Sequence, residues 1–258
     1  MKIIAVIPAH MASVRFPRKI LFPFHGLPMI EHVRRRALMS KAFEDVYVAT
    51  CDEEIASVIR SFGGKVIMTA NTHTNGTSRV AEAVKEIDFT HVVLLQGDEP
   101  LLLPAHVNQL VEAIRRNPEG ASWNATGPIE LEEELDRHSF VKCAVSESNK
   151  IIFCFRRSPA FSDFDKKQTF IRKILGLIAF RKDFLETIVE MPVSRIEKYE
   201  FIEQMRIIEN GYTMTSVPVY PSLPSVNEPE EANIVLEYIN NIPEQSKLLN
   251  DLLNNFKS

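Results

Sequence analysis

Short apolar runs alternate with longer amphipathic segments along the first 116 residues. Continuous runs of Val, Ile and Leu are typical of strands buried on both faces, and apolar residues at helical spacing indicate helices between them. The alternation predicts an α/β fold with a mostly parallel, doubly wound sheet. The expected strands are 3–7, 46–50, 65–68 and 91–96, and the expected helices are 28–39, 53–62, 79–87 and 104–116.

Two local signals mark the ends of the helix predicted over 53–62. Asp52 stands where its carboxylate can cap the free amides of the first turn. Gly63 and Gly64 follow the last turn and can end the helix.

After Gly120 the pattern changes to mixed, β-rich segments with less regular spacing. The polar segment 162–168 predicts a loop or flap. The remaining expected elements are strands at 141–146, 151–155, 174–181 and 212–219, and helices at 195–210, 229–240 and 243–256.

Composition narrows the class of protein. The 258 residues are 45% hydrophobic and 25% charged, with a net charge of −4, which is typical of an ordinary globular chain and argues against a broad nucleic-acid surface. Three scattered cysteines favour a reduced, cytoplasmic setting over a disulfide framework. The apolar stretch before Pro8 is shorter than the roughly 7 residues of a signal peptide core, and no membrane insertion is expected.

A basic loop follows the first predicted strand and carries His10, Arg15, Arg18 and Lys19. Ligands of open α/β sheets bind outside the carboxyl ends of the strands, so this loop predicts an anion site, with a nucleotide as the expected source of phosphates. An Arg offers a planar fork to phosphate oxygens and a Lys a compact charge. The alternative is a solvated surface loop.

Three further segments lie at strand or helix ends. Asp98 follows Gly97 after the fourth strand, where it could hold Mg²⁺ against phosphate oxygens or merely cap a turn. Asn75 and Gly76 open a helix, as a generic cap or as a turn that recognises a base or ribose. Asn227 is either an N-cap or a neutral metal ligand.

Together these segments resemble the 3-deoxy-manno-octulosonate (Kdo) cytidylyltransferase family, of the CMP-sugar-acid synthetase type. The resemblance covers nearly the whole chain. Its motifs are Ile7-Pro-Ala-His-Met-Ala-Ser-Val-Arg-Phe-Pro-Arg-Lys19, Gly26-Leu-Pro-Met-Ile30, Val48-Ala-Thr50, His73-Thr-Asn-Gly-Thr-Ser-Arg79 and Gln96-Gly-Asp-Glu-Pro100, with weaker echoes at 176–181, 203–204 and 226–230.

The resemblance implies a Rossmann-like nucleotide-diphospho-sugar transferase fold in one domain, 1–258, with a smaller mixed β/α dimerisation region. Within that domain it implies a nucleotide-binding half over 1–120, an acceptor-binding and dimerisation region over 121–220, and C-terminal helices over 221–258. A homodimer is expected.

The resemblance also implies the chemistry: an acceptor oxygen attacks the α-phosphorus of CTP in line, and pyrophosphate leaves. Catalytic positions would be Arg15, Lys19 and Asp98, with Mg²⁺ on Asp98 and Asn227. CTP would contact Pro8, Ala9, His10, Ser13, Arg15, Lys19, Thr50, Asn75, Gly76, Thr77, Arg79, Gln96 and Gly97, and the acceptor would contact Gln96, Lys173, Ile174, Ile178, Glu203 and Gln204.

The chain also departs from the family pattern. His10 stands where the family usually has Arg, and Asn227 where it has Asp, so each replaces a fixed charge. Ile174 and Ile178 stand where a His and a Tyr meet the octulosonate, which should change the accepted acid. Two alternatives to a Kdo-type acceptor therefore stay open: another small acid such as a phosphonate, or a non-catalytic nucleotide-binding paralogue.

Overall fold

A computed structural model describes residues 1–160 and 162–256 of the protein. The chain divides into two compact units. The first comprises Met1–Asn108 with the described residues from Leu223 onward, and the second comprises the described part of Gln109–Ser222.

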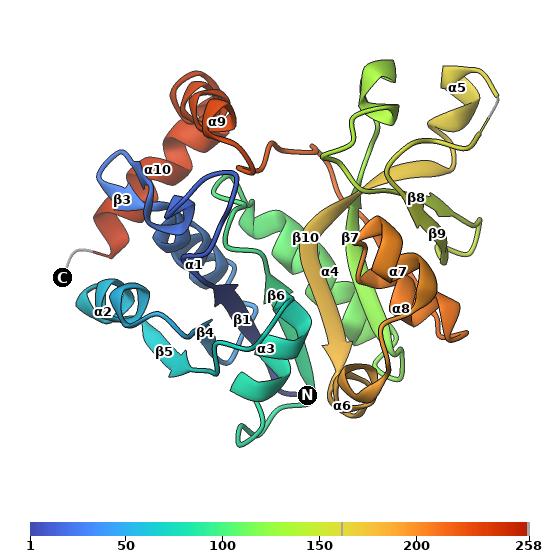
Figure 1. Cartoon of the computed structure of the whole chain (residues 1–258). Helices are drawn as coiled ribbons and strands as arrows, with labels where there is room; N and C mark the ends of the chain where they lie inside the picture. The colour runs from blue at the N-terminus through green and yellow to red at the C-terminus, as the bar shows by residue number, and fades with distance from the viewer. Residues whose placement is uncertain (161, 257–258) are drawn as a thin grey trace. The chain divides into compact units, whose positions relative to one another are not determined.

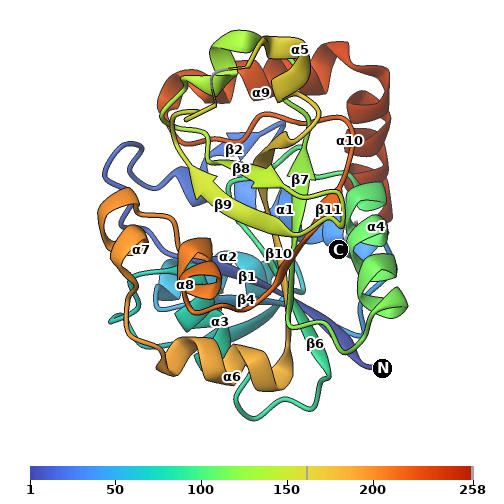
Figure 2. The same cartoon turned by 90° about the vertical axis from the view of Figure 1, so that its right-hand side faces the viewer.

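The first unit contains four parallel strands in the order β6-β1-β4-β5. Every residue of β1 is buried, as expected for a strand covered on both faces. Figure 2 shows α1 and α3 on opposite sides of β1 and β4. The strands are β1 (Ile3–Ala9), β4 (Val46–Thr50), β5 (Lys65–Met68) and β6 (His91–Leu95), and the helices are α1 (Met29–Met39), α2 (Glu53–Ser61) and α3 (Gly76–Ala83).

A short hairpin and two C-terminal helices complete this unit (Figure 1). The second of these helices, α10, packs against α1, where Arg35 Nη1 donates to Leu252 O at 2.9 Å. A second bond, from Gln245 Nε2 to Leu101 O at 3.0 Å, fastens α10 to the segment that follows β6. The elements are η1 (Lys19–Leu21), β2 (Pro23–Phe24), β3 (Leu27–Pro28), α9 (Pro229–Asn241) and α10 (Pro243–Asn255), and α4 (Pro104–Arg116) leads into the second unit.

The second unit is built on a mixed sheet. β10 runs antiparallel to β7 and to β8, whereas β11 runs parallel to β7. α8 packs on β9 and β11. The strands are β7 (Ser122–Gly127), β8 (Lys142–Val145), β9 (Ile151–Phe155), β10 (Ile171–Arg181) and β11 (Met214–Pro218), and the helices are η2 (Glu132–Leu135), α5 (Phe164–Lys167), α6 (Lys182–Glu190), α7 (Arg195–Glu200) and α8 (Gln204–Glu209).

The predicted α/β class with a mostly parallel sheet is confirmed, and all eight elements expected in the first 116 residues are present. The helix expected over 79–87 begins three residues earlier, at Gly76, since Asn75 caps it. Gly63 ends α2 as predicted, with φ +69°. Among the described residues, no helix combines the length and apolar character needed to cross a bilayer.

Predictions for the second unit were less accurate. The strand β7 and the helix α6 were missed, and the segment 162–168 contains a short helix rather than only a loop. The helix predicted over 195–210 is wrong: it is two helices, separated at Phe201, whose φ of +55° ends α7 in the left-handed region.

Candidate active site

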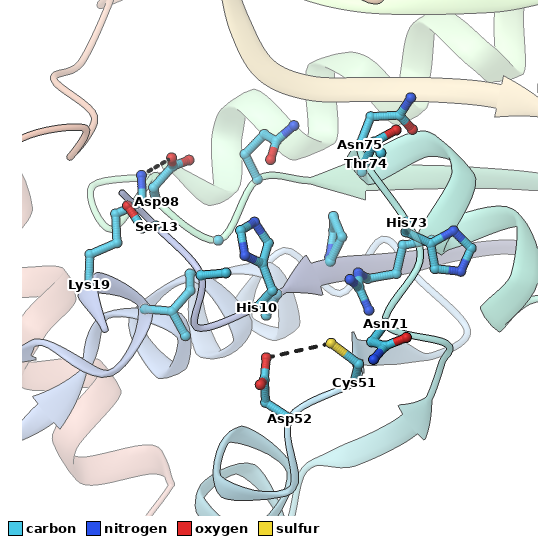
Figure 3. Close-up of a pocket in the computed structure, with 18 residues that line it drawn as sticks. His10, Ser13, Lys19, Cys51, Asp52, Asn71, His73, Thr74, Asn75 and Asp98 are labelled. Atoms are coloured by element: carbon cyan, nitrogen blue, oxygen red, sulfur yellow. Dashed lines mark hydrogen bonds and ion pairs between the residues drawn. The ribbon is translucent and has the colours of Figure 1, made fainter. Parts of the chain in front are cut away.

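A cavity of about 500 Å³ lies in the first unit at the carboxyl ends of β1, β4 and β6 (Figure 3). Because the strands are parallel, their carboxyl ends open onto the same edge of the sheet. The predicted residues that line it are Pro8, Ala9, His10, Ser13, Lys19, Asn75, Gly76, Arg79, Gln96, Gly97 and Asp98.

Lys19 and Asp98 form an ion pair at one end of this cavity. Lys19 Nζ lies 2.7 Å from Asp98 Oδ2 and also donates to Val226 O at 2.8 Å. The two side chains are 14% and 25% exposed, so the pair is shielded from bulk water yet open to the cavity. A cation and a carboxylate so placed can meet a phosphate and a divalent metal ion respectively.

Gly97 allows the loop that carries Asp98 to pass close to β1. A Cβ on Gly97 would lie 2.7 Å from Ile20 Cδ1, and the Pro8 carbonyl is 3.6 Å away. Val226 N donates to Asp98 O at 2.9 Å, so the C-terminal segment is fastened to the same loop. The close approach at Gly97 and the backbone hydrogen bond from Val226 therefore hold this loop in position.

Asn75 is the N-cap of α3, because its Oδ1 accepts from Ser78 N at 2.8 Å. The capping interpretation is therefore confirmed, and Asn75 also lines the cavity. Arg79 is buried and donates to Thr69 Oγ1 at 2.6 Å and to Ala70 O. It fixes the loop before α3 and adds positive charge to that side of the cavity.

His10 lies between the Lys19–Asp98 pair and His73 in Figure 3. Burial, followed by the positive charge of Arg79, lowers the pKa of His10 below its ordinary value of 6.5. At neutral pH the imidazole is therefore mostly uncharged, so His10 adds little positive charge to the cavity.

Several lining residues were missed or misassigned by the sequence analysis, among them Asn71, Cys51 and Asp52. Asp52 occupies the N-cap position of α2, but the predicted capping bond is absent. Its Oδ2 instead accepts from Met11 N at 2.9 Å and, more weakly, from the Cys51 thiol. The Asp52 carboxylate therefore holds the basic loop rather than capping α2. No local sequence signal distinguishes these two roles.

Three predicted nucleotide contacts lie outside the residues that line the cavity. Arg15 is more than half exposed, with Nη1 3.6 Å from Glu228 Oε1. Thr50 is fully buried and accepts from Asp52 N, and Thr77 is 8% exposed. Their roles toward a nucleotide stay predictions.

Asn227 is not an N-cap, so that alternative is wrong. α9 begins at Pro229 and its N-cap is Glu228. Asn227 uses its backbone N–H toward Glu231 and its Nδ2 toward Ser225 Oγ, at 3.1 Å. Its Oδ1 accepts no hydrogen bond from the described residues, and it follows Val226, which contacts both Lys19 and Asp98.

The candidates in the second unit fall on two faces of its sheet. Lys173 is 7% exposed, and its Nζ lies 2.5 Å from Glu134 Oε1. Ile174 and Ile178 pair with Thr126 and Asn124 on the opposite face.

Gln204 and Glu203 stand at the start of α8. Gln204 Nε2 donates to Asn124 Oδ1 at 3.2 Å, which places Gln204 on the face of Ile174 and Ile178. Glu203 occupies the N-cap position of α8.

Sequence comparisons relate the chain to known proteins. A sequence profile of the family described as cytidylyltransferase matches residues 4–216. An 8-amino-3,8-dideoxy-manno-octulosonate cytidylyltransferase of Shewanella piezotolerans is 36% identical over 91% of this chain and 97% of its own length.

Solved structures give the same result for the fold. The structure of a CMP:2-keto-3-deoxy-manno-octonic acid synthetase complexed with CTP superposes with a TM-score of 0.87 at 31% identity, over 93% of this chain and 99% of that one. A cytidylyltransferase of Leptospira borgpetersenii shares the fold with a TM-score of 0.64, at 17% identity, over 99% of this chain and 95% of that one. The chain has the Rossmann-like nucleotidyltransferase fold and belongs to the cytidylyltransferase family.

Proposed function

We propose that this cytidylyltransferase transfers CMP from CTP to a sugar acid of the 3-deoxy-2-ulosonic class and releases pyrophosphate. The observation that carries the proposal is the Lys19–Asp98 pair at the end of a nucleotide-sized cavity, 2.7 Å apart. The names of the relatives support the acceptor class, since they include a cytidylyltransferase for 8-amino-3,8-dideoxy-manno-octulosonate.

In the proposed reaction the acceptor oxygen attacks the α-phosphorus of CTP directly, without an enzyme-bound intermediate. Lys19 would bind phosphate oxygens and offset the negative charge that develops as pyrophosphate leaves. The basic loop, held by Asp52 through Met11 N, would orient the triphosphate for in-line attack. Arg79 and Asn75 would hold the opposite wall of the cavity, where the nucleoside is expected.

The residues present fit a magnesium ion held mainly by substrate. Within 1–160 and 162–256 no cluster of three or more His, Cys, Asp or Glu side chains could bind a metal alone. Mg²⁺ commonly takes one or two protein oxygens together with phosphate oxygens and water. Asp98, which lines the cavity, could supply one protein oxygen, and the Oδ1 of Asn227, which follows the Val226 that is bonded to Asp98 O, could supply another. When bound, Mg²⁺ would neutralise charge on the triphosphate.

Pyrophosphate release from CTP across a panel of acids tests the proposal. Release that depends on Kdo or its 8-amino analogue would support it. Release with a phosphonate instead would support the second acceptor class. Binding of CTP with no release in the presence of any acid would identify a non-catalytic nucleotide-binding protein.

Asn227→Asp is expected to lower the Mg²⁺ concentration for half-maximal activity by about tenfold, because a carboxylate binds Mg²⁺ more strongly than an amide oxygen. The measurement is a Mg²⁺ titration of pyrophosphate release. Asn240→Asp adds the same charge on an exposed position of α9 and should leave the titration unchanged. Identical titrations for wild type and Asn227→Asp would remove Asn227 from the metal site.

His10→Arg is expected to lower the KM for CTP at pH 8 by about 3- to 10-fold, since it adds a fixed cation where His10 is uncharged. The pKa of His10 is lowered, so the wild-type imidazole gains its charge only as the pH falls below 6.5. The contribution of His10 to the wild-type KM should therefore appear only as the pH falls below 6.5, and His10→Arg should flatten this change. If the KM for CTP depends on pH in the same way in wild type, His10→Arg and His10→Gln, the dependence comes from the titration of CTP and not from His10.

We further propose a homodimer that works in the cytoplasm. Ile152, Val193 and Phe201 are 57%, 58% and 82% exposed on the second unit, which favours a partner surface there. The three cysteines are free thiols, which suits a reducing compartment. Sedimentation velocity tests the dimer, and a monomer at micromolar concentration would contradict it.

A further inference from the structure

Arg172 lies on the same face of the second unit's sheet as two of the predicted acceptor contacts, Ile174 and Ile178. Side chains alternate along a strand, so Arg172 of β10 lies on the same face as Ile174, and Lys173 lies on the other. The contacts agree, because Arg172 Nε donates to Thr126 Oγ1 at 2.8 Å and Thr126 pairs with Ile174. Arg172 is partly exposed.

Arg172 has no acidic partner among the residues that the structure describes. Its hydrogen bonds go to Thr126 Oγ1 and to Thr126 O, at 2.8 and 2.9 Å. Cys143 lies opposite it on β8, but burial raises the pKa of that thiol to about 12, so it is uncharged at neutral pH. A partly buried guanidinium is left without a counter-charge, which is unfavourable unless an anion binds.

The other cations near this strand are already neutralised or occupied. Lys173 pairs with Glu134 at 2.5 Å. Lys142, which pairs with Lys173 in the sheet, donates to Arg137 O and Phe140 O at 2.7 and 2.9 Å. Among these three basic side chains, Arg172 is the one that keeps both its charge and exposure on the face with Ile174.

Besides Ile174 and Ile178, this face carries polar side chains that hydrogen bonds hold in position. Asn124 Nδ2 donates to Leu175 O and Leu177 O across the bulge in β10, and its Oδ1 accepts from Gln204. Thr126 Oγ1 also bonds Ser216 Oγ at 2.8 Å. These four polar side chains are buried, so they fix the framework around Arg172, whose guanidinium is the partly exposed polar group beside them.

We infer that Arg172 binds the anionic group of the acidic acceptor, and that Lys173 does not. The inference rests on the proposed transfer of CMP to an acid. Arg172 holds its Nε and Nη2 on Thr126, which orients the guanidinium without neutralising it. The remaining donors can meet a carboxylate in a charge-assisted hydrogen bond.

Arg172→Met removes the charge and keeps most of the side-chain volume. The variant should fold, because Thr126 O still accepts from Val219 N and Thr126 Oγ1 still bonds Ser216. We expect the KM for the acid to rise about 10- to 100-fold, with the KM for CTP changed less than threefold. Arg172→Lys keeps the charge but loses the planar pair of donors, so it should raise the KM for the acid less than Arg172→Met does.

Arg181→Met is the matched control on the same strand. It removes the same charge, but Arg181 is paired with Asp183 on the surface and should have little effect. Lys173→Met is expected to lower stability rather than raise the acceptor KM, because it leaves the partly buried Glu134 carboxylate without its cationic partner.

An acceptor analogue with its carboxylate converted to a carboxamide separates binding from a structural effect. For the wild-type enzyme, the KM for this analogue should exceed the KM for the acid by about the factor that Arg172→Met causes with the acid. For Arg172→Met, the KM should be the same with the analogue as with the acid. An unchanged acceptor KM in Arg172→Met, or equal further loss on the analogue, would overturn the inference. Failure of the wild-type enzyme to release pyrophosphate with any acid would instead contradict the proposed function.

Discussion

Replacing Lys19 with Met is expected to lower kcat for CMP transfer by about 100- to 1,000-fold, the loss typical when one fixed donor to a developing anion is removed. Lys19 is placed for this role by two contacts, to Asp98 Oδ2 and to Val226 O, which aim its ammonium along the cavity edge. Negative charge on the leaving pyrophosphate is larger in the transition state than in bound CTP, so kcat should fall more than the affinity for CTP. Initial rates of pyrophosphate release at saturating CTP measure the effect.

The matched control is Arg18→Met, which removes the neighbouring cation. Arg18 pairs with Glu54 on the surface and does not line the cavity, so its loss should change kcat less than threefold. Thermal unfolding of both variants must show native transitions, since Lys19→Met leaves Asp98 without its partner. A folded Lys19→Met enzyme with near-normal kcat would remove Lys19 from the catalytic site.

The first unit follows closely from its sequence because its strands are buried on both faces. β1 is apolar at nearly every position and all seven residues are buried, so its apolar run is unambiguous. β7 was missed for the opposite reason. Its Ser122, Asn124 and Thr126 are fully buried but polar, and each is satisfied by hydrogen bonds that no local pattern reveals.

Those residues of the candidate site that the sheet topology brings together could be predicted from the sequence. Lys19, Asn75 and Asp98 come together because loops at the carboxyl ends of parallel strands share one edge. Choices among hydrogen-bond partners could not be predicted, since Asp52 could cap α2 or hold Met11 N with similar local geometry. The structure selects the second through a contact 41 positions away in the chain.

The acceptor side depended on a strand register that the sequence left open. The predicted strand began at 174, whereas β10 begins at Ile171, and the alternation then places Arg172 with Ile174 and separates Lys173 from it. A shift of one residue exchanges the two faces. The irregularity between Ile174 and Ile178 adds two residues to β10, an even number, so both side chains stay on one face opposite Thr126 and Asn124.

Asp98→Asn is expected to lower kcat by about 1,000-fold and to raise the Mg²⁺ concentration for half-maximal activity by at least about tenfold. The substitution removes the carboxylate placed to hold the metal and the counter-charge of Lys19 at once. Asn keeps the shape of the side chain, and Val226 still bonds both the backbone of residue 98 and the Lys19 ammonium, so the loop should stay in place. Asp88→Asn, on an exposed ion pair with Lys2, is the control and should leave both quantities unchanged.

A double variant tests whether the pair acts as one unit. If Lys19 and Asp98 stabilise the same transition state through one bound triphosphate and metal, Lys19→Met combined with Asp98→Asn should be little slower than the slower single variant. Losses that multiply would mean that the two residues contribute independently, in spite of the 2.7 Å contact between them. The Mg²⁺ titration separates these cases further, because only a loss through the metal can be partly overcome by excess Mg²⁺. If the rate of Asp98→Asn stays equally low at every Mg²⁺ concentration, Asp98 acts as the counter-ion of Lys19 and not as a metal ligand.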